Sequence, residues 1–134
     1  MSDSQTNSSE PVIACNPKAI PSEKRDEHEA LAQEIFSPAF ILELKELSNG
    51  YGFRLPLETA FLRKVIAFVE NERLCCPFFT FTLVIGEAFW LELSGTQEVK
   101  AYMKAELVTA LETQKFPTFA ELEDAYSTAT SSDN

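Results

Sequence analysis

The sequence lacks most of the short motifs that identify a known chemistry. It contains only four glycines and one histidine among 134 residues. It has no Gly-rich phosphate loop, no nucleophile elbow and no paired-histidine zinc motif. No two cysteines have the Cys-x-x-Cys spacing of common zinc sites. These absences exclude the best-known nucleotide-binding, hydrolase and zinc-protease signatures, so a functional prediction must rest on less regular features.

The chain is also poor in positive charge and in long hydrophobic runs. Lys and Arg number 11 against 21 Asp and Glu, which gives a formal net charge of −10 at pH 7. This balance counts against nucleic acid and anionic membranes as partners, because both attract clustered Lys and Arg. The longest apolar stretches, such as residues 78–85, are far shorter than the roughly 20 residues of a membrane helix. Residues 1–10 do not resemble a signal peptide, so we expect a cytoplasmic protein.

The residues that are present suffice for one domain. Hydrophobic residues make up 45% of the chain, which is enough for a core at this length. Residues 1–11 are polar and rich in Ser, which predicts a disordered tail. We expect a single α+β domain over residues 12–116. An acidic C-terminal extension over residues 117–134 is predicted to form a short helix at residues 119–126 and then to be disordered.

Hydrophobic periodicity and turn signals predict the elements of that domain. Ser22 is a candidate helix N-cap, Asn49-Gly50 is a tight-turn signal, and Pro77 ends the helix before it. Two hairpins, each followed by a helix, predict a four-stranded antiparallel sheet with helices on one face, in the order α-ββ-α-ββ-α. The predicted helices cover residues 22–36, 57–73 and 97–114, and the predicted strands cover residues 40–47, 51–55, 78–85 and 88–93.

The segment with the most chemical potential lies where the central predicted helix ends. It reads Glu72-Arg73-Leu74-Cys75-Cys76-Pro77-Phe78, and the chain has one further cysteine, Cys15. An odd number of cysteines with two of them adjacent does not make the disulfide framework of a secreted domain. In a reducing compartment we therefore expect thiols, metal ligands or redox-active groups.

Our leading hypothesis is a soft-metal site, with a role in metal handling or resistance. Thiolates are good ligands for Zn, Cu(I) and Hg. Cys75 and Cys76 can both bind one ion only if the backbone bends there, and Pro77 favours such a bend. Cys15 is the candidate third ligand, and His28, on the inward face of the first predicted helix, is the candidate fourth.

Two alternatives remain open. A cysteine beside Arg73 can have a lowered pKa and act as the nucleophile or redox centre of a thiol enzyme, with His28 as its base. The C-terminal end of a helix dipole opposes this, since it disfavours a thiolate. The other alternative is a structural or interaction module in which the cysteines are small buried hydrophobic residues.

Other residues are candidates for supporting roles or for partner binding. Glu72 follows the apolar side of the central helix and can pair with Arg73, Arg54 or Arg25 and orient the thiol site. Arg54 is also a candidate for binding a small anionic molecule. Trp90 lies opposite the apolar face of its strand, so it can line a pocket or the interface of a homodimer.

Several segments together resemble a group of small, largely uncharacterised bacterial proteins. The resemblance spans roughly residues 14–102, and Glu-Arg-x-Cys-Cys-Pro-Phe is its most specific motif. It implies a link with metal-resistance neighbourhoods and brings no established reaction. The segments that carry it are Ala14-Cys15, Ile20-Pro21, Arg25, His28, Gly50-Tyr51-Gly52-Phe53-Arg54, residues 72–78 and Trp90-Leu91-Glu92-Leu93-Ser94-Gly95. The site residues that it implies are Cys15, His28, Arg54, Glu72, Cys75 and Cys76.

Overall fold

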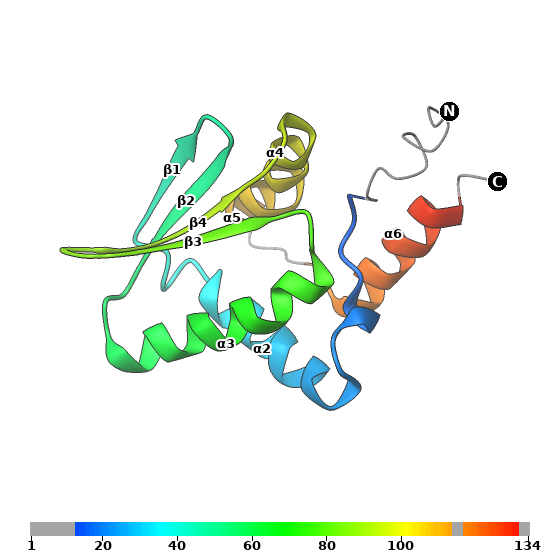
Figure 1. Cartoon of the computed structure of the whole chain (residues 1–134), viewed down its shortest axis with the longest axis horizontal. Coiled ribbons are helices and arrows are strands. Elements are labelled where there is room, and N and C mark those ends of the chain that lie inside the picture. Colours follow the sequence, from blue (N-terminus) through cyan, green and yellow to red (C-terminus); the bar gives the residue numbers. More distant parts are fainter. Residues whose placement is uncertain (1–12, 114–116, 132–134) are drawn as a thin grey trace, which may run out of the picture.

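The computed structural model describes residues 13–113 and 117–131, so the predicted tail over residues 1–11 lies outside the described residues. Four strands form one sheet, and helices gather on one side of it (Figure 1). The elements in chain order are η1 (Pro17–Ala19), η2 (Ser22–Lys24), α2 (Arg25–Ile35), β1 (Glu43–Leu47), β2 (Gly50–Leu55), α3 (Thr59–Cys75), β3 (Thr80–Ile85), β4 (Phe89–Ser94), α4 (Gln97–Met103), the π-helical turn η3 (Lys104–Val108), α5 (Thr109–Thr113) and α6 (Phe119–Ser131).

The predicted sheet is confirmed. Its strand order is β1-β2-β4-β3, with every neighbouring pair antiparallel. The two hairpins therefore meet through their second strands, and β1 and β3 form the two edges. Gly50 is the first residue of β2, and a Cβ atom there would overlap the backbone carbonyl of Leu93 on β4. Gly50 of the predicted Asn49-Gly50 turn is therefore also needed for the close packing of the two central strands.

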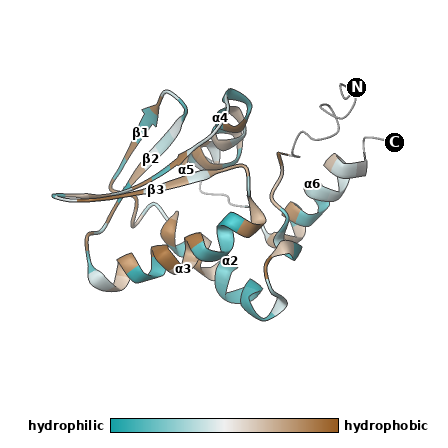
Figure 2. Cartoon of the chain, viewed as in Figure 1, coloured by the Kyte–Doolittle hydropathy of each residue, from teal (hydrophilic) through white to brown (hydrophobic). Residues whose placement is uncertain are grey.

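One face of the sheet carries the main hydrophobic core. In β2 and β4, alternate residues face the same way, as the period of two of a strand requires. Phe53 and Leu91 are paired across these strands and fully buried. Helix α3 covers this face with Val65 and Phe68, and hydrophobic and hydrophilic residues alternate along the helix (Figure 2). Helix α4 lies on the same face, since Val99 and Met103 belong to the same core.

Several predicted boundaries are corrected by the structure. The predicted N-cap at Ser22 is wrong, because Ser22 begins the 3-10 turn η2 and makes no capping hydrogen bond. Helix α3 runs two residues further than predicted, to Cys75, and β1 begins only at Glu43. The predicted helix over residues 97–114 is divided by η3 into two short α-helices.

The C-terminal extension also differs from its prediction. Its helix, α6, continues to Ser131, past the predicted end at residue 126. A capping box begins this helix: the Glu121 amide donates to Thr118 Oγ1 over 3.2 Å, and the Thr118 amide donates to Glu121 Oε1 over 2.8 Å. Helix α6 lies beside the N-terminal segment at the end of the molecule away from the hairpin tips (Figure 1).

The N-terminal segment, residues 13–21, forms an arm that passes the C-terminal end of α3 (Figure 1). The arm, the end of α3 and α6 surround a second, smaller hydrophobic cluster. Its buried members are Cys15, Ile20, Cys75 and Cys76. None of the helices in the described ranges is long and apolar enough to cross a membrane.

Candidate functional site

The three cysteines meet at the C-terminal end of α3. Cys75 is the last residue of the helix, and Cys76 follows it with a non-helical backbone before Pro77. The arm brings Cys15 to the same place, where the Asn16 amide donates a 2.9 Å hydrogen bond to the Cys75 carbonyl. All three side chains are buried, and their sulfur atoms lie within 4.8 Å of one another. The predicted approach of Cys15 to Cys75 and Cys76 is therefore found.

Two of the three sulfurs are bonded to each other. Cys15 and Cys76 form a disulfide between residues 61 positions apart, while Cys75 is a free buried cysteine. Of the thiols, metal ligands or redox-active groups expected from the sequence, only Cys75 is a free thiol in this structure. The bond joins the arm to the residue that follows α3, so in this form the site contains one thiol and one disulfide.

Arg25 also holds the arm in place. Its side chain donates to the carbonyls of Ile20, over 2.9 Å, and Lys18, over 3.1 Å. The guanidinium thereby satisfies two carbonyls of an irregular segment that lack partners in a helix or a sheet. Arg25 is also one of the residues that carry the resemblance to the small bacterial proteins. In this structure its side chain stabilises the arm that brings Cys15 to the other cysteines.

Glu72 and His28 lie directly beside the disulfide. Glu72 sits one helical turn before Cys76, and its Oε2 atom is 3.4 Å from Cys76 Sγ. Its other oxygen, Oε1, is 2.8 Å from Nε2 of the fully buried His28. The imidazole stacks on Phe68 of the main core with ring centroids 5.1 Å apart. The structure thus places Glu72 between His28 and Cys76.

His28 does not join the sulfur cluster. The group of residues able to hold a metal within the described ranges contains the three cysteines and no histidine. Nε2 is occupied by Glu72, and Nδ1 is buried with no hydrogen-bond partner among the described residues. His28 therefore positions the Glu72 carboxylate, and the structure does not bring it to the place predicted for a fourth metal ligand.

The two arginines predicted to support the site lie elsewhere. Arg54 alternates with the buried Phe53 and Leu55, so it projects from the open face of the sheet, where Nε is 3.4 Å from Glu43 Oε1. Arg73 is exposed on the last turn of α3. Trp90 also lies on the open face, with the Lys45 ammonium 4.2 Å from its ring centroid. None of these three side chains lines the pocket beside the cysteines.

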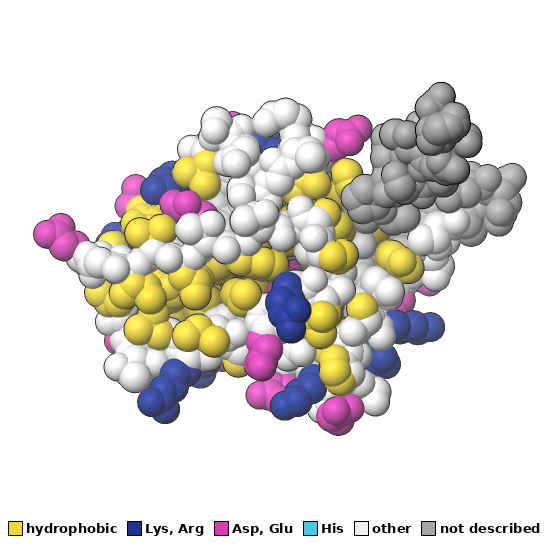
Figure 3. Space-filling view, viewed as in Figure 1, with side chains coloured by type: hydrophobic (Ala, Val, Ile, Leu, Met, Phe, Trp, Pro, Cys, Tyr) yellow, Lys and Arg dark blue, Asp and Glu magenta, His cyan; other side chains and the backbone are white. Residues whose placement is uncertain are grey.

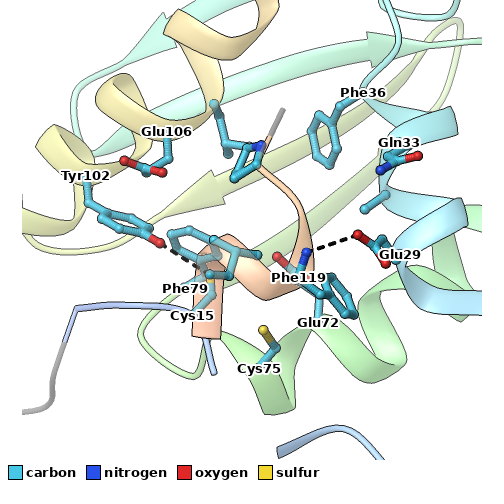
Figure 4. A pocket seen from close by; sticks show the side chains of 14 residues that line it. Cys15, Glu29, Gln33, Phe36, Glu72, Cys75, Phe79, Tyr102, Glu106 and Phe119 are labelled. Carbon is cyan, nitrogen blue, oxygen red and sulfur yellow. Dashed lines mark hydrogen bonds between the residues drawn. The ribbon is translucent and has the colours of Figure 1, made fainter. Parts of the chain in front are cut away.

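A pocket opens beside the sulfurs, between the arm, α2, the end of α3, α4 and α6. Figure 4 shows Cys15 and Cys75 on its wall, with the sulfur of Cys75 directed toward it. The Tyr102 hydroxyl donates to Cys15 Sγ over 3.5 Å, and the Phe119 amide donates to Glu29 Oε2 over 3.0 Å. The lining residues are Cys15, Glu29, Ala32, Gln33, Phe36, Glu72, Cys75, Phe79, Tyr102, Glu106, Leu107, Pro117, Phe119 and Leu122.

The walls of this pocket are apolar, and their formal charges are all negative. Glu29, Glu72 and Glu106 contribute carboxylates, and the described lining residues include no Lys or Arg. Burial, followed by the charge of Glu72, raises the pKa of the Cys75 thiol well above its usual value. Burial, followed by Glu106, raises the pKa of Tyr102 to about 12. Both groups therefore keep their protons at neutral pH. Because the three carboxylates have no Lys or Arg beside them among the described lining residues, the pocket favours a cation over an anion.

Sequence reasoning missed part of this site. The sequence does not single out Tyr102, Glu106 or Glu29, and it predicts a helix in the acidic extension without a role at the cysteines. One signal for α6 was available, because Phe119 and Leu122 are large apolar residues within an acidic extension and both pack on the cysteine cluster. Tyr102 comes directly before the core residue Met103 on α4. The hydrophobic periodicity of this helix therefore does not indicate that Tyr102 lines a site.

Comparison with known proteins adds no family to this geometry. No family model, no curated protein and no solved structure matches the chain. The chemistry of the site is therefore inferred from its own atoms: three clustered sulfurs, a carboxylate held by a buried histidine, and an apolar pocket lined with further carboxylates.

Proposed function

We propose that the protein binds a soft metal cation through Cys15, Cys75 and Cys76 when the disulfide is reduced, in a role in metal handling or resistance. The observation that carries the proposal is the burial of three sulfurs within 4.8 Å of one another. Zn–S bonds of about 2.3 Å separate the sulfurs of a shared ion by about 4 Å. Small side-chain movements therefore suffice to form such a site from the arrangement described.

The electrostatics of the site support a cation as the ligand. Each thiol must lose its proton to bind a metal, so binding releases protons and strengthens as the pH rises. Because the pKa of Cys75 is raised, this dependence extends to higher pH than for an ordinary thiol. Soft ions such as Cu(I), Hg(II) and the borderline Zn(II) bind sulfur strongly enough to displace these protons. The carboxylates of Glu29, Glu72 and Glu106 favour the positive ion and disfavour an anionic ligand.

The disulfide makes this binding dependent on redox state. A dithiol reductant supplies two electrons and two protons, breaks the Cys15–Cys76 bond into two thiols and is itself oxidised to a disulfide. Glu72 Oε2, 3.4 Å from Cys76 Sγ, is placed to accept the proton of the reduced Cys76 thiol when a metal binds. The oxidised protein retains only Cys75 as a free sulfur ligand, so we expect it to bind the metal weakly.

Anaerobic titration of the reduced protein against a competing chromophoric chelator tests this proposal. Zn(II), Cu(I) and Hg(II) are added separately, and we expect one ion per chain for at least one of them. Oxidised protein and the Cys75→Ser/Cys76→Ser variant should bind at least about 100-fold more weakly. Arg54→Gln is the control and should retain binding, since Arg54 lies beside Glu43 on the open face of the sheet and does not line the pocket. Equal binding by the reduced, oxidised and double-variant proteins would overturn the proposal.

A thiol–disulfide exchange protein is the second candidate, favoured by the disulfide and by the Glu72–His28 pair beside it. Against it stand the raised pKa of Cys75 and the position of both cysteines at the negative end of the α3 dipole, because each disfavours an attacking thiolate. Rapid turnover of a small disulfide by the reduced protein, together with weak metal binding, would favour this candidate. Slow thiol–disulfide exchange together with tight metal binding would favour the metal-binding function.

A further inference from the structure

We propose that the protein forms a homodimer by antiparallel pairing of the β3 edges of two copies, which joins the two sheets into one of eight strands. In the strand order β1-β2-β4-β3, no strand of the described ranges pairs with the outer side of β3. That side presents unpaired backbone N–H and C=O groups, which form a template for a further strand. This proposal is independent of the metal site, which lies at the C-terminal end of α3.

The two edges of the sheet differ in how they are protected. β1 reads Glu-Leu-Lys-Glu-Leu, and its charged residues take part in ion pairs with Arg54, Glu92 and Lys100. Charges of this kind prevent edge strands from pairing with other chains. β3 reads Thr-Phe-Thr-Leu-Val-Ile and lies within thirteen consecutive uncharged residues, 74–86. It has no charge, proline or bulge to prevent pairing.

Exposed hydrophobic side chains lie along β3 and on the neighbouring surface of α3. Leu83, Val84 and Ile85 are 36%, 42% and 55% exposed, and Ile66 on α3 is 54% exposed. Figure 3 shows hydrophobic side chains gathered in a band where β3 passes over α3. A partner aligned along β3 would cover this band as well as the free backbone groups, which is typical of a protein interface.

A second copy of this chain fits the edge by sequence and by charge. Antiparallel pairing centred on Thr82 keeps residues of one face together: on the open face Thr82 meets its own copy and Thr80 meets Val84, and on the helix-covered face Phe81 meets Leu83. Two chains with a net charge of −10 each repel one another, and an uncharged edge is where they can approach with the least repulsion. The Trp90 surface is less suitable, because Lys45 covers the ring and pairs with Glu92.

Sedimentation equilibrium of the full chain over a wide range of concentrations, in reductant to exclude intermolecular disulfides, tests the dimer. We expect the wild type to approach twice the 15.0 kDa chain mass. Leu83→Lys should raise the dimer dissociation constant by about tenfold or more, because it places a charge within the paired edge. Leu44→Lys is the matched control on β1, since Leu44 is 39% exposed, and it should dimerise like the wild type.

Hydrogen exchange of the wild type gives a second measurement that does not depend on the folding of a variant. Amides of β3 should be better protected at high than at low protein concentration, while those of β1 should not change. A wild type that stays monomeric at all concentrations overturns the proposal. Protection of the β3 amides that does not depend on concentration would mean that a segment of the same chain covers this edge, and would also overturn the proposal. Equal loss of the dimer in Leu83→Lys and Leu44→Lys would place the interface elsewhere.

Discussion

The two hydrophobic clusters of this protein are stabilised in different ways. The main core is formed by the sheet with α2, α3 and α4, and its fully buried side chains include Phe53, Phe68 and Leu91. The cysteine cluster joins the arm, the end of α3 and α6, and its centre is a disulfide with one free thiol. The first cluster depends on the burial of apolar surface, whereas the second depends also on the oxidation state of two sulfurs.

The clusters are connected by Phe78 and Phe79, which pack against both, and by the polar pair of His28 and Glu72. His28 stacks on Phe68 of the main core, and its Nε2 atom holds Glu72 beside the disulfide. Because the imidazole packs on the main core, it holds the Glu72 carboxylate beside Cys76. The main core is thus a scaffold, and the cysteine cluster is the region whose covalent structure changes on reduction.

The largest effect is expected from a cavity in the main core. Phe53 is fully buried, and its ring packs edge-on against Phe36 with centroids 5.2 Å apart. Phe53→Ala should lower the free energy of unfolding by about 3–5 kcal/mol. Urea unfolding followed by circular dichroism should give the same loss with and without reductant. The exposed Thr82→Ala is the control and should change stability by less than about 0.5 kcal/mol. A loss for Phe53→Ala that depends on reductant would contradict the independence of the two clusters.

Reduction of the disulfide should have the next largest effect. The bond closes a loop between positions 61 residues apart, so its loss should lower the unfolding free energy by about 2–4 kcal/mol. Proteolysis should then cut the arm and α6 before the sheet, since both pack on the cysteine cluster. Cys75→Ser should retain this sensitivity to reductant, and Cys15→Ser should abolish it. Equal urea midpoints for the oxidised and reduced wild type would show that the bond does not stabilise the fold.

The sequence predicted the main core better than the cysteine cluster. The alternation of Tyr51, Phe53 and Leu55 and the turn at Asn49-Gly50 are local signals, and the sheet they predicted is the one found. Helix ends were less accurate, because the continuation of α3 to Cys75 depends on contacts with the distant arm, including the Asn16 amide.

Sequence patterns identified the cysteines but not their bonding partners. The proximity of Cys15 to Cys76 is set by the path of the arm, which Arg25 fixes through backbone carbonyls. The sequence does not show that Arg54 projects from the open face of the sheet, whereas the arm packs beside the C-terminal end of α3. No local pattern distinguishes a histidine that holds a carboxylate from one that binds a metal, so the pairing of His28 with Glu72 required the structure.

An intermediate effect is expected from alkaline pH, through Tyr102. Its pKa is raised from about 10 to about 12 by burial and by Glu106. Above pH 10 the unfolded chain loses this proton while the folded chain keeps it, so stability falls as the pH rises from 10 to 12. In a Cys75→Ala background, this difference should amount to about 1 kcal/mol at pH 11.

Urea unfolding at pH 8 and pH 11 measures this difference. Tyr102→Phe in the same background is the control, because it removes the titrating group and retains the ring that contacts Phe78. Its stability should fall less between the two pH values. Equal losses for the two proteins would mean that Tyr102 ionises in the folded state as readily as in the unfolded chain.

The smallest expected effect concerns the reactivity of Cys75 in the oxidised protein, where it is the free cysteine. Burial is the larger cause of its raised pKa and the charge of Glu72 the smaller. Glu72→Gln should therefore lower this pKa and accelerate alkylation at pH 8 severalfold, within the tenfold of about one pKa unit. The reaction should remain slower than that of an exposed thiol, because burial is unchanged.

Alkylation by iodoacetamide, followed by mass spectrometry between pH 7 and pH 10, measures this rate. Glu106→Gln is the matched control, since Glu106 lines the same pocket but acts on Tyr102 rather than on Cys75. An increase confined to Glu72→Gln would show that the carboxylate held by His28 controls the protonation of the cluster. Equal rates in the wild type and in both variants would leave burial as the sole cause, and would remove Glu72 from the proton chemistry of the site.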